Sequence, residues 1–311
     1  MSPEGRQIIP GSGGADPYQI EGIDRPETRP VIPMGQKSYD GDRQPRMGFF
    51  TDTTVCIGCK ACEVACKEWN NVPATLFEFT GNSYDNTGEL GADSWRHVAF
   101  VEQRKPIKVQ QEAGVMIPPA TGGEEDFRWL MSSDVCKHCS EAPCLDVCPT
   151  GSLFRTEFGT VVVQEDICNG CGYCVPACPF GVLDRRDDDG RVWKCTLCYD
   201  RQKGGLEPAC AQACPTDSIQ YGPLDELREK ANGRLEMLVE AGVTDARLYG
   251  ANEEEYGMGA FFLLLDDPEV YRLPPDPEVV TRKFKSLWGP AGVAAGALAA
   301  GVLAAFIGGS R

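Results

Sequence analysis

Residues 168–179 read CNGCGYCVPACP and carry four cysteines at the spacing Cys168-x2-Cys171-x2-Cys174-x3-Cys178, with Pro179 directly after the last. The chain has sixteen cysteines among its 311 residues, and the others fall into three further groups of four. These groups are Cys56, Cys59, Cys62 and Cys66; Cys136, Cys139, Cys144 and Cys148; and Cys195, Cys198, Cys210 and Cys214. The repeated grouping predicts one local structure that is used four times.

The spacing has a chemical reason. Three thiolates in a C-x2-C-x2-C loop can bind three irons of one [4Fe–4S] cluster, and the fourth cysteine, about one helical turn further on, binds the neighbouring cluster. A proline after the fourth cysteine then ends the helix, and the repeats CPTGSL, CPFGVL and CPTDSI each lead from that turn into an apolar residue. We therefore expect an α+β fold with two ferredoxin-like dicluster modules, made of short helices and small antiparallel sheets around four [4Fe–4S] clusters.

The pairing of the groups follows from their order. The second and third groups are adjacent in the sequence and should form one module, while the first and fourth groups, which flank them, should form the other. The expected iron ligands of the four clusters are Cys56, Cys59 and Cys62 with Cys214; Cys195, Cys198 and Cys210 with Cys66; Cys136, Cys139 and Cys144 with Cys178; and Cys168, Cys171 and Cys174 with Cys148. The first group has Lys67 where the others have proline, so its helix can continue through KEWN.

Zinc, disulfides and a radical-generating cluster are the alternative uses of these cysteines. Zinc sites prefer C-x2-C pairs joined by longer loops, and a C-x2-C-x2-C-x3-C run fits tetrahedral geometry poorly. Disulfides are typical of secreted chains, whereas the opening MSPEGRQIIPGSGGADP has no apolar run and predicts no general secretory signal. A radical-generating cluster uses three cysteines, but each group here has four. A structural zinc or regulatory cysteine-rich protein is thus a remote alternative.

The cysteines divide the chain into segments. Residues 1–47 mix Pro, Gly and charges without a hydrophobic period, and we expect an extended N-terminal arm. Residues 48–222 should form the four-cluster core, interrupted by a cysteine-free insert at 67–135 in which WRHVAFVEQ (95–103) suggests a strand. Residues 223–280 contain no cysteine and should form a C-terminal cap and linker, with a helix that stops near Gly242 and a buried strand in AFFLLL.

The last segment, residues 281–311, is expected to be a transmembrane anchor. Residues 287–307 carry no charge, and as a helix they would span about 30 Å. The alternative is an Ala-rich helix that docks on a soluble partner. Gly292 and Gly296 form a small-xxx-small pair suited to close packing against another membrane helix, so a membrane-embedded partner is expected.

The composition and the two histidines argue against catalysis in this chain. The formal net charge of −16 argues against nucleic acid or an anionic membrane surface as the main partner. His138 lies between two expected ligands and would either tune a cluster by hydrogen bonding or be exposed, and His97 is the only other histidine. Fully ligated clusters leave no open iron for a substrate, so we expect a chain that conducts electrons and leaves the bond chemistry to a partner.

Three stretches carry a family resemblance. FFTDTTVCIGCKACEVACKEWN, CKHCSEAPCLDVCPTGSLFRTEFGTVVVQEDICNGCGYCVPACPFGVLDR and KCTLCYDRQKGGLEPACAQACPTDSIQYG resemble the iron–sulfur β subunit of membrane-bound formate dehydrogenases over roughly residues 48–222. The same four-motif plan occurs in electron-transfer subunits of nitrate, dimethyl sulfoxide and polysulfide reductases. In several of those a cysteine of the fourth motif is replaced, whereas Cys198 and its neighbours are all present here. The equivalent subunit of such a reductase or of a hydrogenase is the alternative.

The resemblance implies partners and a location. A catalytic subunit with a molybdenum or tungsten pterin would oxidise formate and pass electrons to this chain, which would pass them to a quinone-reactive membrane subunit, either a b-type cytochrome or a haem-free protein. Arg282, Lys283 and Lys285 precede the apolar segment and only Arg311 follows it, which by the positive-inside rule favours a cytoplasmic cluster domain. The resemblance instead implies the outer face, reached by export beside a partner with a twin-arginine signal, and this is the orientation that we expect.

Overall fold

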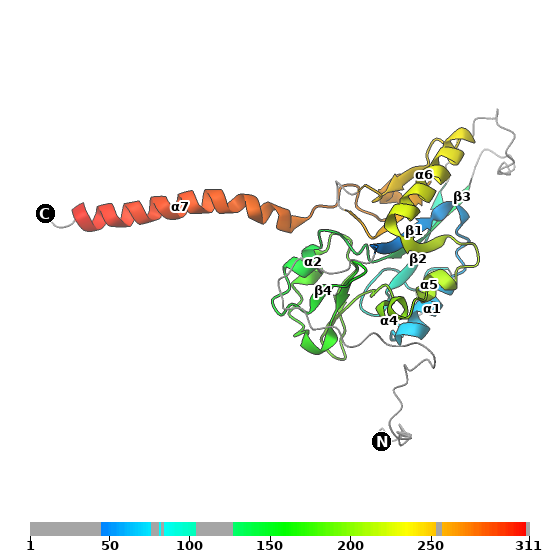
Figure 1. Cartoon of the computed structure of the whole chain (residues 1–311), viewed down its shortest axis with the longest axis horizontal. Coiled ribbons are helices and arrows are strands. Elements are labelled where there is room, and N and C mark those ends of the chain that lie inside the picture. The colour runs from blue at the N-terminus through cyan, green and yellow to red at the C-terminus, as the bar shows by residue number, and fades with distance from the viewer. Residues whose placement is uncertain (1–44, 76–80, 82–83, 104–126, 253–256, 309–311) are drawn as a thin grey trace, which may run out of the picture. The chain divides into compact units, whose positions relative to one another are not determined.

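The computed structural model describes residues 45–75, 81, 84–103, 127–252 and 257–308 (Figure 1). The expected N-terminal arm therefore lies almost entirely outside the described residues, as does the acidic part of the insert around residues 124–126. The described elements combine short helices with small sheets, as expected of an α+β fold.

A four-stranded sheet joins the beginning of the described chain to its later part. Its order is β8 (Ile219–Pro223), β1 (Met47–Asp52), β10 (Ala260–Leu264) and β9 (Arg247–Tyr249). The β1–β8 and β10–β9 pairs are antiparallel, but β1 and β10 run parallel. The sheet is thus mixed, whereas the sequence led us to expect antiparallel sheets only. Because β9 and β10 come from the expected cap and β1 from the expected core, these two segments share one sheet.

The two faces of this sheet have different neighbours. Phe50 stacks on Phe261 with 5.3 Å between the ring centroids, and both pack with Leu224 and Leu227 of α6 (Leu224–Glu240). Because neighbouring strand residues point to opposite faces, Phe49 lies on the other face, in the core that contains the cysteines. The sheet therefore separates an apolar layer under α6 from the cysteine-rich core. The helix α6 and the strand β10 confirm the two elements expected between residues 223 and 280, and Gly242 follows α6 with a positive φ.

The insert forms an antiparallel hairpin of β2 (Arg96–Gln103) and β3 (Arg128–Val135). Arg96 pairs with Val135, so the start of β2 lies beside the residue that directly precedes Cys136. The strand expected in WRHVAFVEQ is confirmed. The hairpin also contacts η1 (Thr53–Val55), the 3-10 turn before the first cysteine group, and so it lies against both the first and the second groups.

Short helices and hairpins surround the cysteines. They are α1 (Ala61–Asn70), α2 (Pro143–Asp146), α3 (Cys174–Ala177), α4 (Tyr199–Lys203), α5 (Ala209–Gln212), the turns η2 (Glu165–Ile167) and η3 (Pro268–Tyr271), and the hairpins β4 (Leu153–Arg155)–β5 (Val161–Val163) and β6 (Asp184–Arg185)–β7 (Val192–Trp193). Helix α1 extends through Asn70, as expected where Lys67 replaces proline. It packs against α5 of the fourth group (Figure 1). Helix α2 packs against α3. The groups thus pair as first with fourth and second with third.

The described chain ends in α7 (Val280–Gly308). Val293, Leu298, Val302 and Phe306 are 75%, 71%, 55% and 79% exposed. Across the described ranges, no helix combines the length and apolar character needed to cross a membrane. The helix itself was expected, and its transmembrane character stays a prediction.

Candidate iron–sulfur sites

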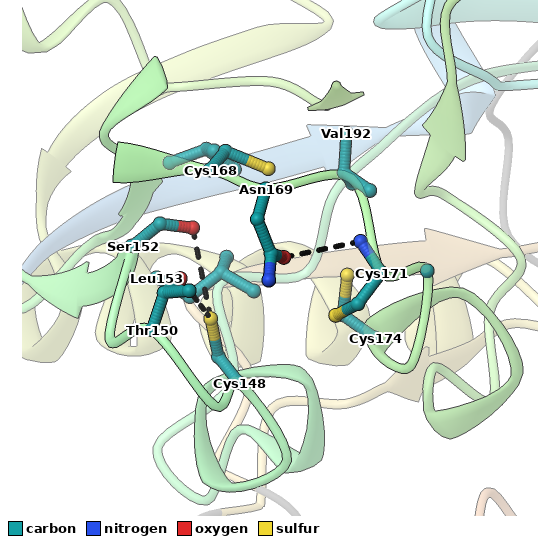
Figure 2. A pocket seen from close by; sticks show the side chains of 11 residues that line it. Cys148, Thr150, Ser152, Leu153, Cys168, Asn169, Cys171, Cys174 and Val192 are labelled. Carbon is teal, nitrogen blue, oxygen red and sulfur yellow. Dashed lines mark hydrogen bonds between the residues drawn. The ribbon is translucent and has the colours of Figure 1, made fainter. Parts of the chain in front are cut away.

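Four cysteines from two different groups line one cavity. Cys148 of the second group lies with Cys168, Cys171 and Cys174 of the third group around this space (Figure 2). Cys148 reaches this space because α2 ends just before it, so that its side chain leaves the loop that holds the rest of its own group. The fourth cysteine of one group therefore lies with the first three of its neighbour.

The reciprocal set lines a second cavity. Its cysteines are Cys136, Cys139, Cys144 and Cys178. Cys178 follows α3 directly, and Cys148 follows α2 after one residue, Val147. Since α2 and α3 pack together, the two cavities are neighbours, and each helix leads from one to the other.

The first and fourth groups exchange their last cysteines in the same way. The Asn70 Nδ2 lies 3.7 Å from both Cys66 Sγ and Cys198 Sγ, so a cysteine of the first group is beside one of the fourth. Burial raises the pKa of Cys66 well above its ordinary value, and Cys195, Cys210 and Cys198 raise it further. Conversely, Cys214 of the fourth group is among the neighbours that raise the pKa of Cys56, after burial itself.

A left-handed residue recurs between the first two cysteines of every group. Gly58, His138, Gly170 and Leu197 each occupy the second position of a C-x2-C loop, and their φ values are +66°, +42°, +69° and +56°. Successive right- and left-handed residues turn backbone N–H groups to one side and form a concave site for anions. The N–H of Leu197 accordingly donates to Cys195 Sγ at 3.3 Å. The repeated local structure that the spacing predicts is therefore present in all four groups.

The turn after the fourth cysteine also directs donors at sulfur. Burial alone would raise the pKa of Cys148, but the N–H of Leu153 and donors of Ser152 and Thr150 lower it to about 7. The two hydroxyls lie 3.6 Å from Cys148 Sγ (Figure 2). The N–H groups of Val182 and Phe180 act in the same way on Cys178. The CPTGSL and CPFGVL repeats thus supply donors that stabilise a thiolate.

These donor sets fit iron–sulfur clusters. Burial raises the pKa of Cys62 to about 11 and that of Cys139 to about 12, so these thiols need a bound cation to become thiolates. Within the described ranges, no three His, Cys, Asp or Glu side chains converge closely enough to hold a single metal ion. A [4Fe–4S] cube carries its cysteine ligands on four separate irons, so ligands spread around a cavity suit it.

Of the two histidines, His138 is part of a site and His97 is not. His138 is 1% exposed and lines the cavity of Cys136 and Cys139, so the expectation that it could be exposed is wrong. Its Nδ1 accepts a hydrogen bond from the N–H of Val161 at 3.1 Å, which leaves the proton of a neutral ring on Nε2. Nε2 has no partner among the described residues, and burial holds the pKa of His138 well below its ordinary value. His97 instead contacts Asp85.

Three buried polar residues near the cysteines were not identified from the sequence. Arg96 is 2% exposed, Lys194 is 1% exposed, and Ser133 lies with its Oγ 3.2 Å from Cys62 Sγ. The strand alternation could have identified Arg96, because it shares a face of β2 with Val98, which is 1% exposed. Lys194 immediately precedes Cys195 and donates to the carbonyls of Val161 and Cys195, and no sequence pattern indicates that it is buried.

Comparison with known proteins identifies the family. Two models described as 4Fe-4S dicluster domains match residues 55–152 and 127–224. The formate dehydrogenase-O iron-sulfur subunit of Escherichia coli is 36% identical over 88% of this chain and 86% of its own length, and the nitrate-inducible formate dehydrogenase iron-sulfur subunit of the same organism is 36% identical over 92% and 90%.

A subunit of the anaerobic dimethyl sulfoxide reductase of E. coli is 35% identical over 59% of this chain and 76% of its own length. The similarity to the dimethyl sulfoxide reductase subunit therefore covers less of this chain than the similarity to the formate dehydrogenase subunits does. The chain is an electron-transfer iron–sulfur subunit of a molybdopterin oxidoreductase, with four [4Fe–4S] clusters. It belongs to the family of formate dehydrogenase iron–sulfur subunits.

Proposed function

We propose that this chain relays electrons from a formate-oxidising catalytic subunit to a quinone-reactive membrane subunit. The observation that carries the choice of formate is the extent of the similarity, which covers 88% of the chain for the formate dehydrogenase-O subunit and 59% for the dimethyl sulfoxide reductase subunit. The expected equivalents from nitrate or polysulfide reductases and from hydrogenases remain alternatives of the same class.

The sixteen cysteines are the proposed iron ligands, in the four crossed sets that the spacing predicts. The two cavities support the sets of Cys136, Cys139, Cys144 with Cys178 and of Cys168, Cys171, Cys174 with Cys148. The proximity of Cys66 to the fourth group and of Cys214 to Cys56 supports the other two sets. When bound, each cluster supplies one-electron transfer, and the chain's own residues hold the sulfurs, exclude water and stabilise their charge.

We infer that the four sets form a row. Cys62 of the first set and Cys210 of the second are electrostatic neighbours, as are Cys195 of the second and Cys136 of the third. Helices α2 and α3 then connect the third set to the set of Cys148 and Cys168. A row of this kind suits transfer from one end of the chain's core to the other.

Exposure supports entry and exit at the two ends of the row. Cys59 in the first set and Cys171 in the last set are exposed, whereas no cysteine of the two middle sets is. Electrons can therefore reach partners at the end sets, while the cysteines of the middle sets are buried or partly buried.

We further propose that α7 lies in the membrane beside the quinone-reactive subunit, with the cluster-bearing region on the outer face. Val293, Leu298 and Phe306 support a lipid or partner contact because these large apolar side chains are exposed in the chain by itself. Protease treatment of intact spheroplasts tests the orientation, since an outer cluster domain is digested and a cytoplasmic one is protected.

Anaerobic purification of the complex tests the function. We expect about sixteen irons and as many sulfides per chain, a co-purifying molybdopterin subunit, and bleaching of the clusters by formate. Near-stoichiometric zinc with little iron would refute an electron carrier. Reoxidation of prereduced clusters by dimethyl sulfoxide, without any effect of formate, would instead assign the chain to the reductase branch.

The ligand sets have a separate test in Cys214→Ala. It should damage the cluster that Cys56, Cys59 and Cys62 hold, because Cys214 is among the neighbours of Cys56. Low-temperature EPR of the reduced protein reports which signal is lost. Loss of the signal that Cys198→Ala also removes would contradict the crossed assignment.

A further inference from the structure

A buried guanidinium lies at the junction of two cysteine sets. Arg96 begins β2 in the insert and is 2% exposed. Its Nη1 donates to the carbonyl of Ser133 at 3.3 Å and to Ser133 Oγ at 3.1 Å, and its planar group lies 4.8 Å from the ring centroid of Phe49. Among the described residues, Nε and Nη2 have no hydrogen-bond partner.

The two unpartnered nitrogens of this cation are suited to an anion. An arginine cannot release its proton in a protein, and a buried charge that is unpaired costs many kcal/mol. Other buried cations nearby are satisfied by protein groups: Lys137 is paired with Asp134, and Lys194 donates to two carbonyls. Arg96 has no carboxylate within ion-pair distance in the described ranges, and unlike Lys194 it has two nitrogens without a hydrogen-bond partner there.

The neighbours of Arg96 are cysteines of two different sets. Phe49, over whose ring the guanidinium lies, packs in one buried cluster with Cys62, Cys195 and Cys210. In agreement with this placement, burial alone would lower the pKa of Arg96, but the same cysteines raise it above its ordinary value. Cys62 belongs to the set with Cys56, whereas Cys210 and Cys195 belong to the set with Cys66. A [4Fe–4S] cluster with four thiolates carries a net negative charge, and reduction adds a further electron, so both neighbouring sets supply the anion that the guanidinium lacks.

Arg96 also acts through Ser133. Because Ser133 Oγ accepts a hydrogen bond from Arg96, its own proton is free to donate to Cys62 Sγ, which lies 3.2 Å away. A hydrogen bond to a ligand sulfur stabilises the more negative, reduced state. The cation and the hydroxyl therefore act in the same direction on the first set.

We propose that Arg96 is a shared counter-ion of the two clusters in the module of the first and fourth groups, and that it raises the reduction potentials of both. This proposal rests on the crossed ligation proposed above. Reduction of either cluster moves negative charge towards the same guanidinium, so this one side chain favours electron occupancy at both sites and weakens the repulsion between them. The insert, whose role the sequence did not reveal, thereby contributes to the electron path.

Redox titration of the intact complex, followed by EPR, tests the proposal. Arg96→Gln removes the charge and should lower the reduction potentials of both clusters by about 59 mV or more. This shift corresponds to a tenfold change in the equilibrium constant of a one-electron reduction. Arg96→Lys keeps the charge and should retain most of each potential. The potential of the cluster at Cys148 and Cys168 should not change, nor should any potential in the control His97→Gln, a buried neighbour on the opposite face of β2.

Two results would overturn the proposal. One is an Arg96→Gln protein with full iron content and unchanged potentials; the other is a shift of equal size in all four clusters, which would indicate a general structural change. If Arg96→Gln does not assemble its clusters, the unmodified complex made with isotopically labelled arginine is used instead. A shared counter-ion should give nitrogen hyperfine coupling to both reduced clusters. Absence of this coupling would refute the contact. A complex that lacks four clusters from the start contradicts the proposed function instead.

Discussion

Replacing Arg128 by methionine should loosen the insert hairpin. Arg128 begins β3, and its Nη2 donates to Asp266 Oδ2, which follows the last strands of the expected cap. The two side chains are only 7% and 4% exposed. Removal of one partner from such a buried ion pair costs about 3–5 kcal/mol, because the other charge stays buried. Even the lower value corresponds to about a hundredfold change in an equilibrium constant.

Native-state hydrogen exchange measures this effect in the intact cluster-bearing protein. Amides of β2 and β3 should exchange about a hundredfold faster or more in Arg128→Met, while amides of α1 and α5 should not, since exchange reports the free energy of local opening. A matched double variant, Arg128→Met with Asp266→Leu, removes both charges. Its free energy of local opening should lie within about 1 kcal/mol of that of the parent chain. The two single variants, Arg128→Met and Asp266→Leu, would each accelerate exchange by some factor. If the double variant is accelerated by the product of these two factors, the two side chains are not coupled and the reasoning is refuted.

Two further predictions concern turns and pH. Gly170→Ala should lower the melting temperature and the iron content, because its φ is +69° and a Cβ would clash with the carbonyl oxygen of Gly190. The control is Gly181→Ala, which has φ +62° and open space around its Cβ, and which should lower the free energy of unfolding by only about 1 kcal/mol. Equal loss of stability in the two variants would contradict the steric explanation. Asp85→Asn should destabilise the insert by about 1–3 kcal/mol near neutral pH, because it weakens the contact with buried His97. Although burial alone would raise the pKa of Asp85, hydrogen bonds, including one from His97, hold it below its ordinary value. The stabilisation is therefore present above the ordinary pKa of an aspartate and is lost as pH falls through the lowered pKa of Asp85. Urea denaturation of the parent and the variant measures it, and a difference between their midpoints that persists at acid pH would contradict the role of this pair.

The cysteine groups and their turns could be predicted from the sequence because their structure is local. Spacing fixes which sulfurs share a loop, and the proline after the fourth cysteine fixes the turn that follows. The helix at Leu224–Glu240 and the strand at Ala260–Leu264 were likewise visible as apolar patterns. The continuation of the first helix through Asn70 followed from a single replaced proline.

The remaining features depend on contacts between distant segments. Nothing in the sequence around β1 indicates that it pairs in parallel with β10, because strand partners are chosen by packing across the whole chain. The burial of Lys194 and the orientation of His138 both depend on Val161, whose carbonyl accepts from the lysine and whose N–H donates to the histidine. Such polar contacts leave no periodic signal in the sequence.

The exchange of the last cysteines between the first and fourth groups has a consequence for how the protein is made. Under the proposed ligand sets, Cys148 and Cys178 complete the inner module, that of the second and third groups, as soon as the third group has been synthesised. The outer module, that of the first and fourth groups, would need both Cys66 and Cys214, near the two ends of the core. Under the crossed ligation, the two outer clusters can be completed only after translation has passed the fourth group. The maturation machinery can therefore complete the inner module first, and a chain truncated before Cys214 should leave the ribosome able to hold only part of its set of cofactors.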